Sequence, residues 1–474
     1  MSKDAGKTDS YGAVDQGDAE TARPDPAAAR KLPQYFAAVT AMLGALSMGT
    51  VVGWSSTAIE MIAQETPLTV SEKSWIGSSA NLGGAVVMLA MPFLMARLGR
   101  RGTMLALAPP LLASWLLLAL VPRVPALVAG RFLTGLFGGA YSVVGPVYNG
   151  EIAQKEIRGA LGAFYQLFLC SGLLLAYLVG YAGSLVGLSL ACAAVPAVLF
   201  VALLFVPESP LYLLTRGRRD EALEALRWLR GPAFDVQREL REAEQFVAES
   251  RKSKVGFREA LGTRPAVRAL VICSGVMMIQ QLSGIKAVVF YTVTIFKDSG
   301  SSLDPYMCTL VAGGVLAGAT GVSALVVDRC GRRLLLLLSG VGTTLCHAAL
   351  GLYFHLHAHH PETAAGLGWL PLVSLCLYLI TYTMGFGAVS WVLVGEMFPS
   401  AIKEAAGSFC AFVNWFLAFV VTLVFPYMLS GLGPAISFWL FSSVCLLGLL
   451  FVWFLCIETK GKTLEEIQKE LAMA

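Results

Sequence analysis

Long apolar segments recur along this chain of 474 residues, and they limit what it can fold into. Each is about 20 residues long, which is the length that a helix needs to cross a lipid bilayer. Only 14% of the residues are charged, against roughly 25% in soluble proteins. Because lipid offers no hydrogen bonds to the backbone, such segments must satisfy their own polar groups as helices. The sequence therefore predicts an all-α protein that crosses a membrane many times.

The apolar segments form two groups of six on either side of a charged stretch. We expect the first six at 34–59, 74–96, 103–121, 125–149, 159–183 and 186–206, and the second six at 266–296, 305–327, 334–356, 368–394, 405–429 and 434–456. This pattern divides the chain into a disordered polar tail (1–33), a six-helix bundle (34–206), a linker (207–262), a second six-helix bundle (263–457) and a tail (458–474). Leucine and tryptophan spacing predicts short amphipathic helices in the linker, near 220–229 and 236–249.

Three charged motifs occur twice, in the same order, once in each half. Each half has a basic stretch, then a glutamate followed seven residues later by a basic residue, then a glutamate beside serine or threonine. The first set is 97–102, Glu151 with Arg158, and Glu208; the second is 328–333, Glu396 with Lys403, and Glu458. Motifs repeated in one order indicate a duplicated architecture. Duplicated halves in a membrane are typical of secondary transporters, whose substrate site lies between the halves.

Lysine and arginine crowd the loops that would lie on one side of the membrane, at 97–101, 155–158, 216–268 and 329–333. Positive residues accumulate on the cytoplasmic side, so we expect the linker and both termini there. The net charge of +4 follows from these loops and gives no indication of nucleic-acid binding. The plasma membrane is the first expectation for localisation, with an internal membrane as the alternative.

The sequence gives no sign of an enzyme, a cofactor or a metal centre. There is no Walker-type phosphate loop, no Ser/His/Asp arrangement and no metal-spaced Cys/His set in the spans. The ten cysteines have no paired spacing, so free buried thiols are expected. The five histidines fall between His347 and His360. Four of them cluster in 354–360, and we interpret this cluster as a solvated loop on the non-cytoplasmic side, with a metal site or a pH sensor as the alternative.

Four amide side chains interrupt the apolar spans, at Gln166, Gln280, Gln281 and Asn414. Polar groups are expensive at mid-membrane and usually face a cavity. Amides supply donors and acceptors without charge, and nearby indoles supply flat apolar faces. The indoles are Trp391 and Trp415. This mixture suits a sugar, which has hydroxyls at its edge and C–H faces between them. The alternative is that the amides only bridge helices.

From about residue 34 to 466 the chain resembles the sugar porters of the major facilitator superfamily, and in particular the arthropod trehalose and vertebrate hexose facilitators. The matching stretches are Gly130-Arg131-Phe132, Pro146-Val147-Tyr148, Arg158-Gly159, Pro207-Glu208-Ser209-Pro210, Gln280-Gln281-Leu282-Ser283-Gly284, Asp328-Arg329, Gly331-Arg332-Arg333, Asn414-Trp415 and Glu458 to Leu464. The resemblance implies two six-helix halves that expose one site to alternate sides. It also implies that Gln166, Gln280, Gln281, Trp391 and Asn414 touch sugar.

The resemblance further implies gates on both sides of the site. Tyr291 belongs to the outer gate, and on a regular helix it shares nearly one face with Gln280 and Gly284. At the inner side, charged residues are expected to form ion pairs between the halves; the alternative is that they only mark topology. These residues are Arg97, Arg101, Glu151, Arg158, Glu208, Arg329, Arg333, Glu396, Lys403 and Glu458.

Four positions differ from the residues found in related sugar porters. Lys286 replaces an asparagine that contacts sugar in sugar porters, and a charge at the bilayer centre costs roughly 2.5–3.5 kcal/mol. Ala388 and Ser390 replace prolines, which predicts a straighter helix. The aspartate that proton-coupled porters carry near Val51 is absent.

The resemblance therefore favours a facilitative uniporter that moves trehalose or a hexose such as glucose and works as a monomer in the bilayer. Two alternatives stay open. One is a proton-linked or anionic-sugar carrier that uses Lys286. The other is a sugar sensor that does not transport.

Overall fold

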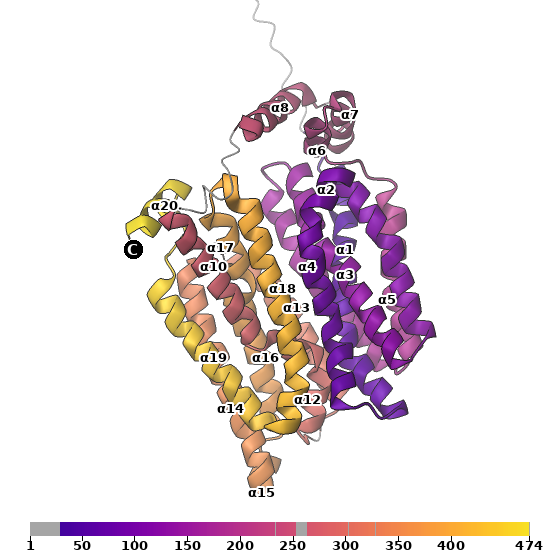
Figure 1. The fold of residues 1–474 in the computed structure, drawn as a ribbon, viewed down its shortest axis with the longest axis vertical. Coiled ribbons are helices and arrows are strands. Elements are labelled where there is room, and N and C mark those ends of the chain that lie inside the picture. Colours follow the sequence, from indigo (N-terminus) through magenta and orange to yellow (C-terminus); the bar gives the residue numbers. More distant parts are fainter. Residues whose placement is uncertain (1–28, 233, 253–262, 302, 328, 474) are drawn as a thin grey trace, which may run out of the picture.

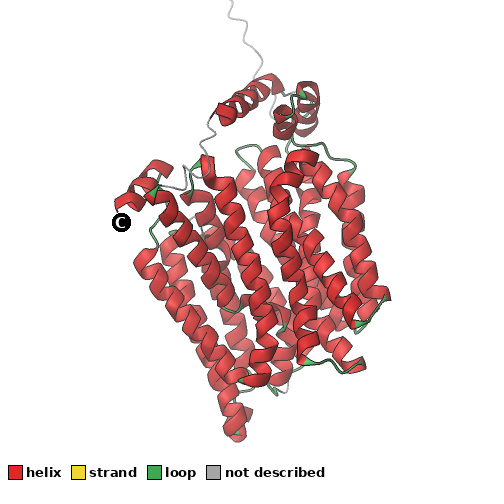
Figure 2. Ribbon diagram, viewed as in Figure 1, coloured by secondary structure: helices red, strands yellow, loops and turns green. Residues whose placement is uncertain are grey.

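The computed structural model describes residues 29–473, except 233, 253–262, 302 and 328. Most of the tail expected at 1–33 lies outside the described residues. Helices make up nearly all of the described chain, and it contains no strand (Figure 2). Eleven of the described helices are long and apolar enough to cross a membrane. The all-α membrane fold expected from the sequence is confirmed.

The first half of the chain is built from five long helices, one of which is sharply bent. The second helix has 51 residues, and Gly99 inside it has φ +82°, so it supplies two of the expected spans. A Cβ at Gly99 would lie 2.4 Å from the Glu208 carboxylate, so this bend requires glycine on both conformational and steric grounds. The helices are α1 (Leu32–Glu65), α2 (Val70–Leu120), α3 (Val124–Ile152), α4 (Arg158–Tyr181) and α5 (Leu185–Leu203).

The second half repeats this arrangement, but two of its membrane segments are interrupted. One segment is divided among α10, α11 and α12, and another has a π-helical turn, η1, between α16 and α17. A π-turn without proline directly precedes Ala388, and the expectation of a straighter helix there stays a prediction. The helices are α10 (Arg264–Leu282), α11 (Ile285–Phe290), α12 (Thr292–Asp298), α13 (Pro305–Val326), α14 (Arg332–His359), α15 (Pro361–Ala365), α16 (Leu370–Tyr382), η1 (Thr383–Gly387), α17 (Ala388–Met397), α18 (Ser400–Gly431) and α19 (Pro434–Leu455).

The linker carries three short helices, which lie over one end of the first half (Figure 1). We call this end of the molecule the linker face and the opposite end the far face. Helix α7 ends at Gly231, and apolar side chains of α6, α7 and α8 form a small core of their own. The helices are α6 (Pro210–Thr215), α7 (Arg219–Arg230) and α8 (Val236–Lys252), and a last helix, α20 (Leu464–Met473), lies at the linker face of the second half.

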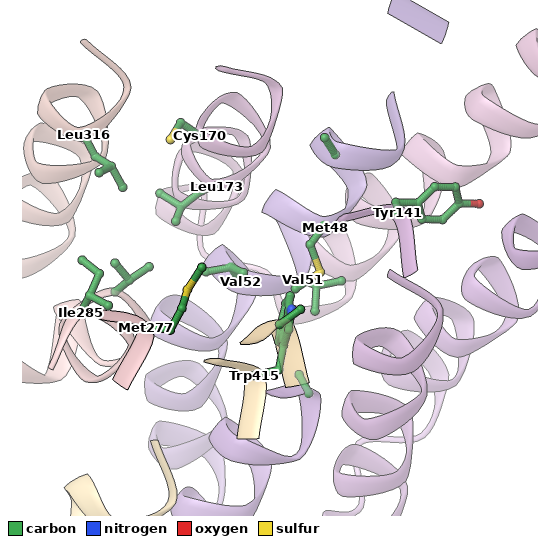
Figure 3. Packing of buried hydrophobic residues seen from close by; sticks show 14 of the residues in the cluster. Met48, Val51, Val52, Tyr141, Cys170, Leu173, Met277, Ile285, Leu316 and Trp415 are labelled. Carbon is green, nitrogen blue, oxygen red and sulfur yellow. The ribbon is translucent and has the colours of Figure 1, made fainter. Parts of the chain in front are cut away.

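The two halves stand side by side and share one apolar cluster (Figure 1). Figure 3 shows Met277 and Trp415 of the second half pointing toward Val51 and Val52 of α1. Within the first half, α1 and α4 approach so closely that a Cβ on Gly49 would lie 2.0 Å from the Leu169 carbonyl oxygen. Close backbone packing through small residues is the usual way that helices associate in lipid.

Candidate substrate site between the halves

A break in one membrane segment lies at the centre of the site. Helix α10 ends at Leu282, Gly284 follows with φ +86°, and α11 begins at Ile285. A left-handed residue stops a helix, and glycine adopts that conformation at no steric cost. The placement of Gln280, Gly284 and Tyr291 on one face of a regular helix is therefore wrong, since the helix is interrupted between them. The break turns α11 away from the glutamines of α10.

Three of the predicted amides meet beside this break. Gln281 Nε2 donates to Asn414 Oδ1 at 3.0 Å, and Asn414 Nδ2 donates to Gln280 Oε1 at 2.6 Å. Gln280 Nε2 donates in turn to the Phe386 carbonyl in η1 at 2.7 Å. All three amides are buried, and Gln281 Oε1 has no hydrogen-bond partner among the described residues. The cluster therefore offers one buried acceptor for which a ligand hydroxyl is a suitable donor.

Lys286 lies on the other side of the break, against two aromatic rings. Its ammonium is 5.4 Å from the centre of the Trp415 ring and 5.8 Å from that of Phe290. No carboxylate lies within ion-pair distance of it among the described residues. Cation–π contacts compensate in part for the lost hydration of the charge. Trp415 is fixed from the first half, because a Cβ on Gly84 would lie 2.6 Å from its ring.

The remaining predicted sugar contacts do not join the amide cluster. Gln166 is exposed on α4, and its partner is the Cys170 thiol, whose sulfur is 3.6 Å from Nε2. Cys170 in turn lies 3.3 Å from Thr320 Oγ1 on α13, so this contact crosses between the halves. Trp391 on α17 is 45% exposed. Neither side chain makes a hydrogen bond to the three amides. Each could therefore share a binding site with them only by contacting the same ligand.

The halves are closed against each other on the far face. Tyr291 donates to the Thr422 carbonyl at 3.0 Å, and Asn81 of α2 donates to Thr422 Oγ1 at 3.1 Å. The tyrosine therefore lies in a sealed contact between α2 and α18, consistent with its predicted place in the outer gate. A Cβ on Gly77 of α2 would lie 2.2 Å from the tyrosine oxygen, so only glycine allows this approach.

Sequence reasoning missed an ion pair in the same closure. Lys297 of α12 lies 3.0 Å from Glu60 of α1, and Thr294 donates to the same carboxylate at 2.7 Å. The Glu60 side chain is 4% exposed and that of Lys297 is 55% exposed. Glu60 stands at the end of an apolar span. An isolated acidic residue at that position was the only feature of the sequence that could have indicated a partner on the other half.

At the linker face the charged motifs form two equivalent clusters, one in each half. Arg100 lies 2.6 Å from Glu151, and Arg332 lies 2.8 Å from Glu396. Ser209 donates to Glu151, and Thr459 donates to Glu396 at 2.6 Å. The described ion pairs here lie within the halves, and the pairs expected between the halves, which would hold this side shut and break when it opens, stay a prediction.

The arginines that make these pairs are not the ones that the sequence motifs suggested. Arg101 and Arg333 donate instead to main-chain carbonyls, at Leu203 and Trp453. The bend at Gly99 changes the direction of the residues that follow it, so Arg100 faces Glu151. Four further predicted gate residues have exposed side chains and form no ion pair with another described residue: Arg97, Arg158, Arg329 and Lys403.

Glu208 and Glu458 hold the bends of their halves together. Glu208 accepts from the backbone N–H groups of Arg100, Arg101 and Gly102, and Glu458 accepts from those of Arg332 and Arg333. Burial opposes ionisation of Glu458, but the backbone donors outweigh it and lower the pKa of this carboxyl below its ordinary value. Each glutamate is therefore a structural clamp for its loop.

A buried cation in α3 also escaped the sequence interpretation. Arg131 is fully buried and donates to the Val51 carbonyl at 2.8 Å and to the Ser55 hydroxyl at 2.5 Å. Its guanidinium lies 4.9 Å from the centre of the Trp54 ring. The charge thus rests on neutral acceptors and an aromatic face, and α1 brings these to the position where the sequence lacks an aspartate.

Two six-helix halves, sealed against each other on one face and with a cluster of buried amides in the second half, define a membrane transporter of the alternating two-bundle type. Residues 36–471 match the family model described as "Sugar (and other) transporter". The chain belongs to this sugar transporter family.

Named relatives and solved structures agree with that assignment. The chain is 38% identical to a facilitated trehalose transporter of Drosophila pseudoobscura pseudoobscura over 92% of its own length, and it spans only about half (51%) of that relative. It is also 38% identical to a Tret1-2 homolog of Drosophila sechellia, covering 91% of it, and 36% identical to Tret1 of Polypedilum vanderplanki, covering 88%.

The fold is similar to that of the xylose transporter XylE from E. coli, at 25% identity over 92% of this chain and 99% of that one. The TM-score is 0.77 for its inward open conformation and 0.73 for the proton:xylose symporter XylE bound to 6-bromo-6-deoxy-D-glucose.

Proposed function

We propose that this protein is a facilitative sugar transporter that moves trehalose or a hexose such as glucose down its gradient by alternating access. The observation that carries the proposal is the cluster of Gln280, Gln281 and Asn414 at a broken helix. Uncharged amides with a free buried acceptor suit hydroxyl groups better than they suit ions. The naming of several relatives as trehalose transporters supports the disaccharide as the first substrate to test.

The contacts between the halves support a carrier that is open toward the linker face. Their hydrogen bonds and ion pairs lie from mid-span to the far face among the described residues, as at Cys170 with Thr320, Asn81 with Thr422 and Glu60 with Lys297. Of the two conformations compared above, the inward open one has the higher TM-score. Arginine and lysine crowd the linker face, so we assign that face to the cytoplasm. The state described is then the inward-facing one.

The surroundings of Arg131 support uniport over proton coupling. A proton carrier needs a group that titrates during the cycle, and a carboxylate beside a buried arginine is a suitable one. Arg131 has instead the Val51 carbonyl and the Ser55 hydroxyl, neither of which exchanges charge. We therefore expect sugar uptake into liposomes without proton movement.

The test of the site is the substitution Gln281→Ala in purified protein reconstituted in liposomes. Loss of Gln281 removes the free acceptor and the hydrogen bond to Asn414, so we expect uptake of trehalose and glucose to fall at least tenfold. The matched control is Gln237→Ala, which removes an exposed glutamine of α8. Uptake by Gln281→Ala equal to that of the unmodified protein would reject the assigned site.

Lys286 favours a second candidate function, the transport of an anionic sugar. Its ammonium has no carboxylate partner among the described residues, and a carboxylate on the substrate would supply one. An uptake panel of trehalose, glucose, fructose and a sugar acid separates the two candidates. Under the first, Lys286→Asn improves neutral sugar uptake; under the second, it abolishes uptake of the acid. A protein that binds sugar without equilibrating it would instead be a sensor.

A further inference from the structure

The break between α10 and α11 is held by two side chains from helices behind it. A helix that stops leaves backbone carbonyls without intrahelical donors, and buried carbonyls need partners. The carbonyl oxygen of Ser283 receives His347 Nε2 at 2.9 Å and the Tyr378 hydroxyl at 3.2 Å. His347 belongs to α14 and Tyr378 to α16, so the break is tied to both.

His347 stands apart from the cluster of the other four histidines and falls within the span predicted at 334–356. It lies inside α14 with 1% of its surface exposed. Its ring is 4.2 Å from that of Tyr378 and 5.7 Å from that of Phe441, measured between ring centres. Phe441 also packs on Gly284, where a Cβ would lie 2.8 Å from the phenylalanine ring. The histidine is therefore enclosed by the same aromatic side chains that support the break.

Hydrogen-bond logic assigns the protonation state of this imidazole. The Ser283 carbonyl can only accept, so Nε2 must carry the proton. Nδ1 is buried without a partner among the described residues. A second proton there would place an unsatisfied charged donor in an apolar pocket, which is costly. The neutral tautomer with Nε2–H is the one that fits.

This clamp connects directly to the amide cluster. The Ser283 hydroxyl donates to the Gln280 carbonyl at 2.8 Å, and Gln280 Nε2 donates to the Phe386 carbonyl in η1. Tyr378, which bonds Ser283, lies on α16, the helix that leads into η1. The break and the π-turn are therefore tied in both directions, from Tyr378 to Ser283 and from Gln280 to Phe386.

We propose that His347 is a positioning residue for sugar binding. Its neutral imidazole holds the Ser283 carbonyl and thereby fixes the angle of the break, and so the orientation of Gln280 and Gln281, without touching the sugar. This inference rests on the proposed transport function. If the proposal holds, sugar affinity depends on the hydrogen-bond donor of His347. If the residue only packs, sugar affinity depends on its side-chain volume alone.

The first test compares two substitutions in liposome uptake and in sugar binding, each normalised to folded protein. His347→Gln keeps an N–H donor near the position of Nε2, and His347→Leu keeps much of the volume without a donor. Loss of one buried hydrogen bond predicts that His347→Leu raises the half-saturating sugar concentration at least about fivefold. His347→Gln should stay within about twofold of the unmodified protein. If the leucine variant does not fold, His347→Phe replaces it.

Equal behaviour of the glutamine and leucine variants would overturn the proposal, whether both bind normally or both bind poorly. A failure of the unmodified protein to bind or equilibrate any sugar would instead reject the transport function itself. The two failures are therefore distinguishable in one experiment.

A second test uses the shared acceptor. Tyr378→Phe removes the other donor to Ser283, so the carbonyl is left unsatisfied only when both donors are absent. We expect the combined His347→Leu and Tyr378→Phe variant to lose more affinity than the product of the single effects, because residues that share a partner are not additive. Strictly multiplicative effects would contradict a common clamp.

Discussion

Lys297 of α12 lies 3.0 Å from Glu60 of α1, and the pair joins the two halves of the molecule at the far face. The carboxylate is almost fully buried and also accepts from Thr294, whereas the lysine reaches solvent. A buried carboxylate with two partners on the opposite half stabilises the conformation in which these halves touch. When the far face opens, the carboxylate must exchange those partners for water.

We predict that Glu60→Gln shifts the protein toward the state that is open at the far face. Hydrogen bonds to a charged group contribute about 1.5–3 kcal/mol, so the shift should be at least about tenfold. Hydrogen exchange of the peptide 289–298 should become faster as its contacts open. Glu65→Gln, at the exposed end of the same helix, is the control and should leave exchange unchanged. Unaltered exchange in Glu60→Gln would show that the pair does not hold the closure.

A larger side chain between α2 and Tyr291 should also shift the protein toward the state that is open at the far face, because it clashes with the tyrosine. Gly77→Val places a Cβ where the tyrosine oxygen lies 2.2 Å away, so the far face cannot close. Liposome uptake should fall at least tenfold, while the protein remains folded in a thermal-shift assay. Gly314→Val adds the same side chain on an exposed face of α13, with no atom within 4 Å of the new Cβ, and should transport normally. Full activity of Gly77→Val would mean that the tyrosine moves aside freely.

The linker-face clusters lie within the halves, so their loss should affect stability more than the conformational equilibrium. Arg332→Ala leaves Glu396 without its ion-pair partner in a partly buried position, and we expect a loss of about 1–3 kcal/mol in unfolding free energy. Arg329→Ala removes an exposed guanidinium nearby and should change little. Thermal unfolding in detergent measures both. A shift in far-face hydrogen exchange without loss of stability would favour ion pairs between the halves.

The lowered pKa of Glu458 predicts how stability at the linker face depends on pH. A carboxyl with a folded pKa below its unfolded value stabilises the protein above that unfolded value, here about 4.5, and the contribution is lost as pH falls through the folded pKa. Melting temperature should therefore be little affected by this group between pH 7 and about pH 4.5, and should drop below about pH 4.5 by more in the unmodified protein than in Glu458→Gln. The substitution should also lower stability at pH 7, because Glu458 accepts from Arg332 and Arg333 through separate oxygens, whereas the introduced amide has one acceptor oxygen and no charge. An identical pH profile in the two proteins would contradict the assignment.

Much of the architecture could be predicted from short stretches of sequence, because it depends on properties of single helices. Span length and apolar composition depend on neighbouring residues in one helix, so the all-α membrane fold could be predicted before any tertiary contact was known. The repeat of Glu151 and Glu396 in equivalent contexts indicated a duplicated architecture, and each glutamate forms an equivalent ion pair in its own half. Polar side chains in apolar spans also pointed correctly to Gln280, Gln281 and Asn414, three amides that meet in space.

Contacts between distant helices could not be read from the sequence. Whether Arg100 or Arg101 pairs with Glu151 depends on the bend at Gly99, whose left-handed conformation is set by its contact with Glu208. The partners Glu60 and Lys297 are separated by 237 residues and meet only because the halves close on the far face. His347 lies in a predicted span and had no role assigned from the sequence; packing placed it behind the broken helix. Composition and periodicity determine which segments enter the membrane; the rotation and closure of those helices decide which polar groups meet, because each pairing depends on the packing of the whole interface.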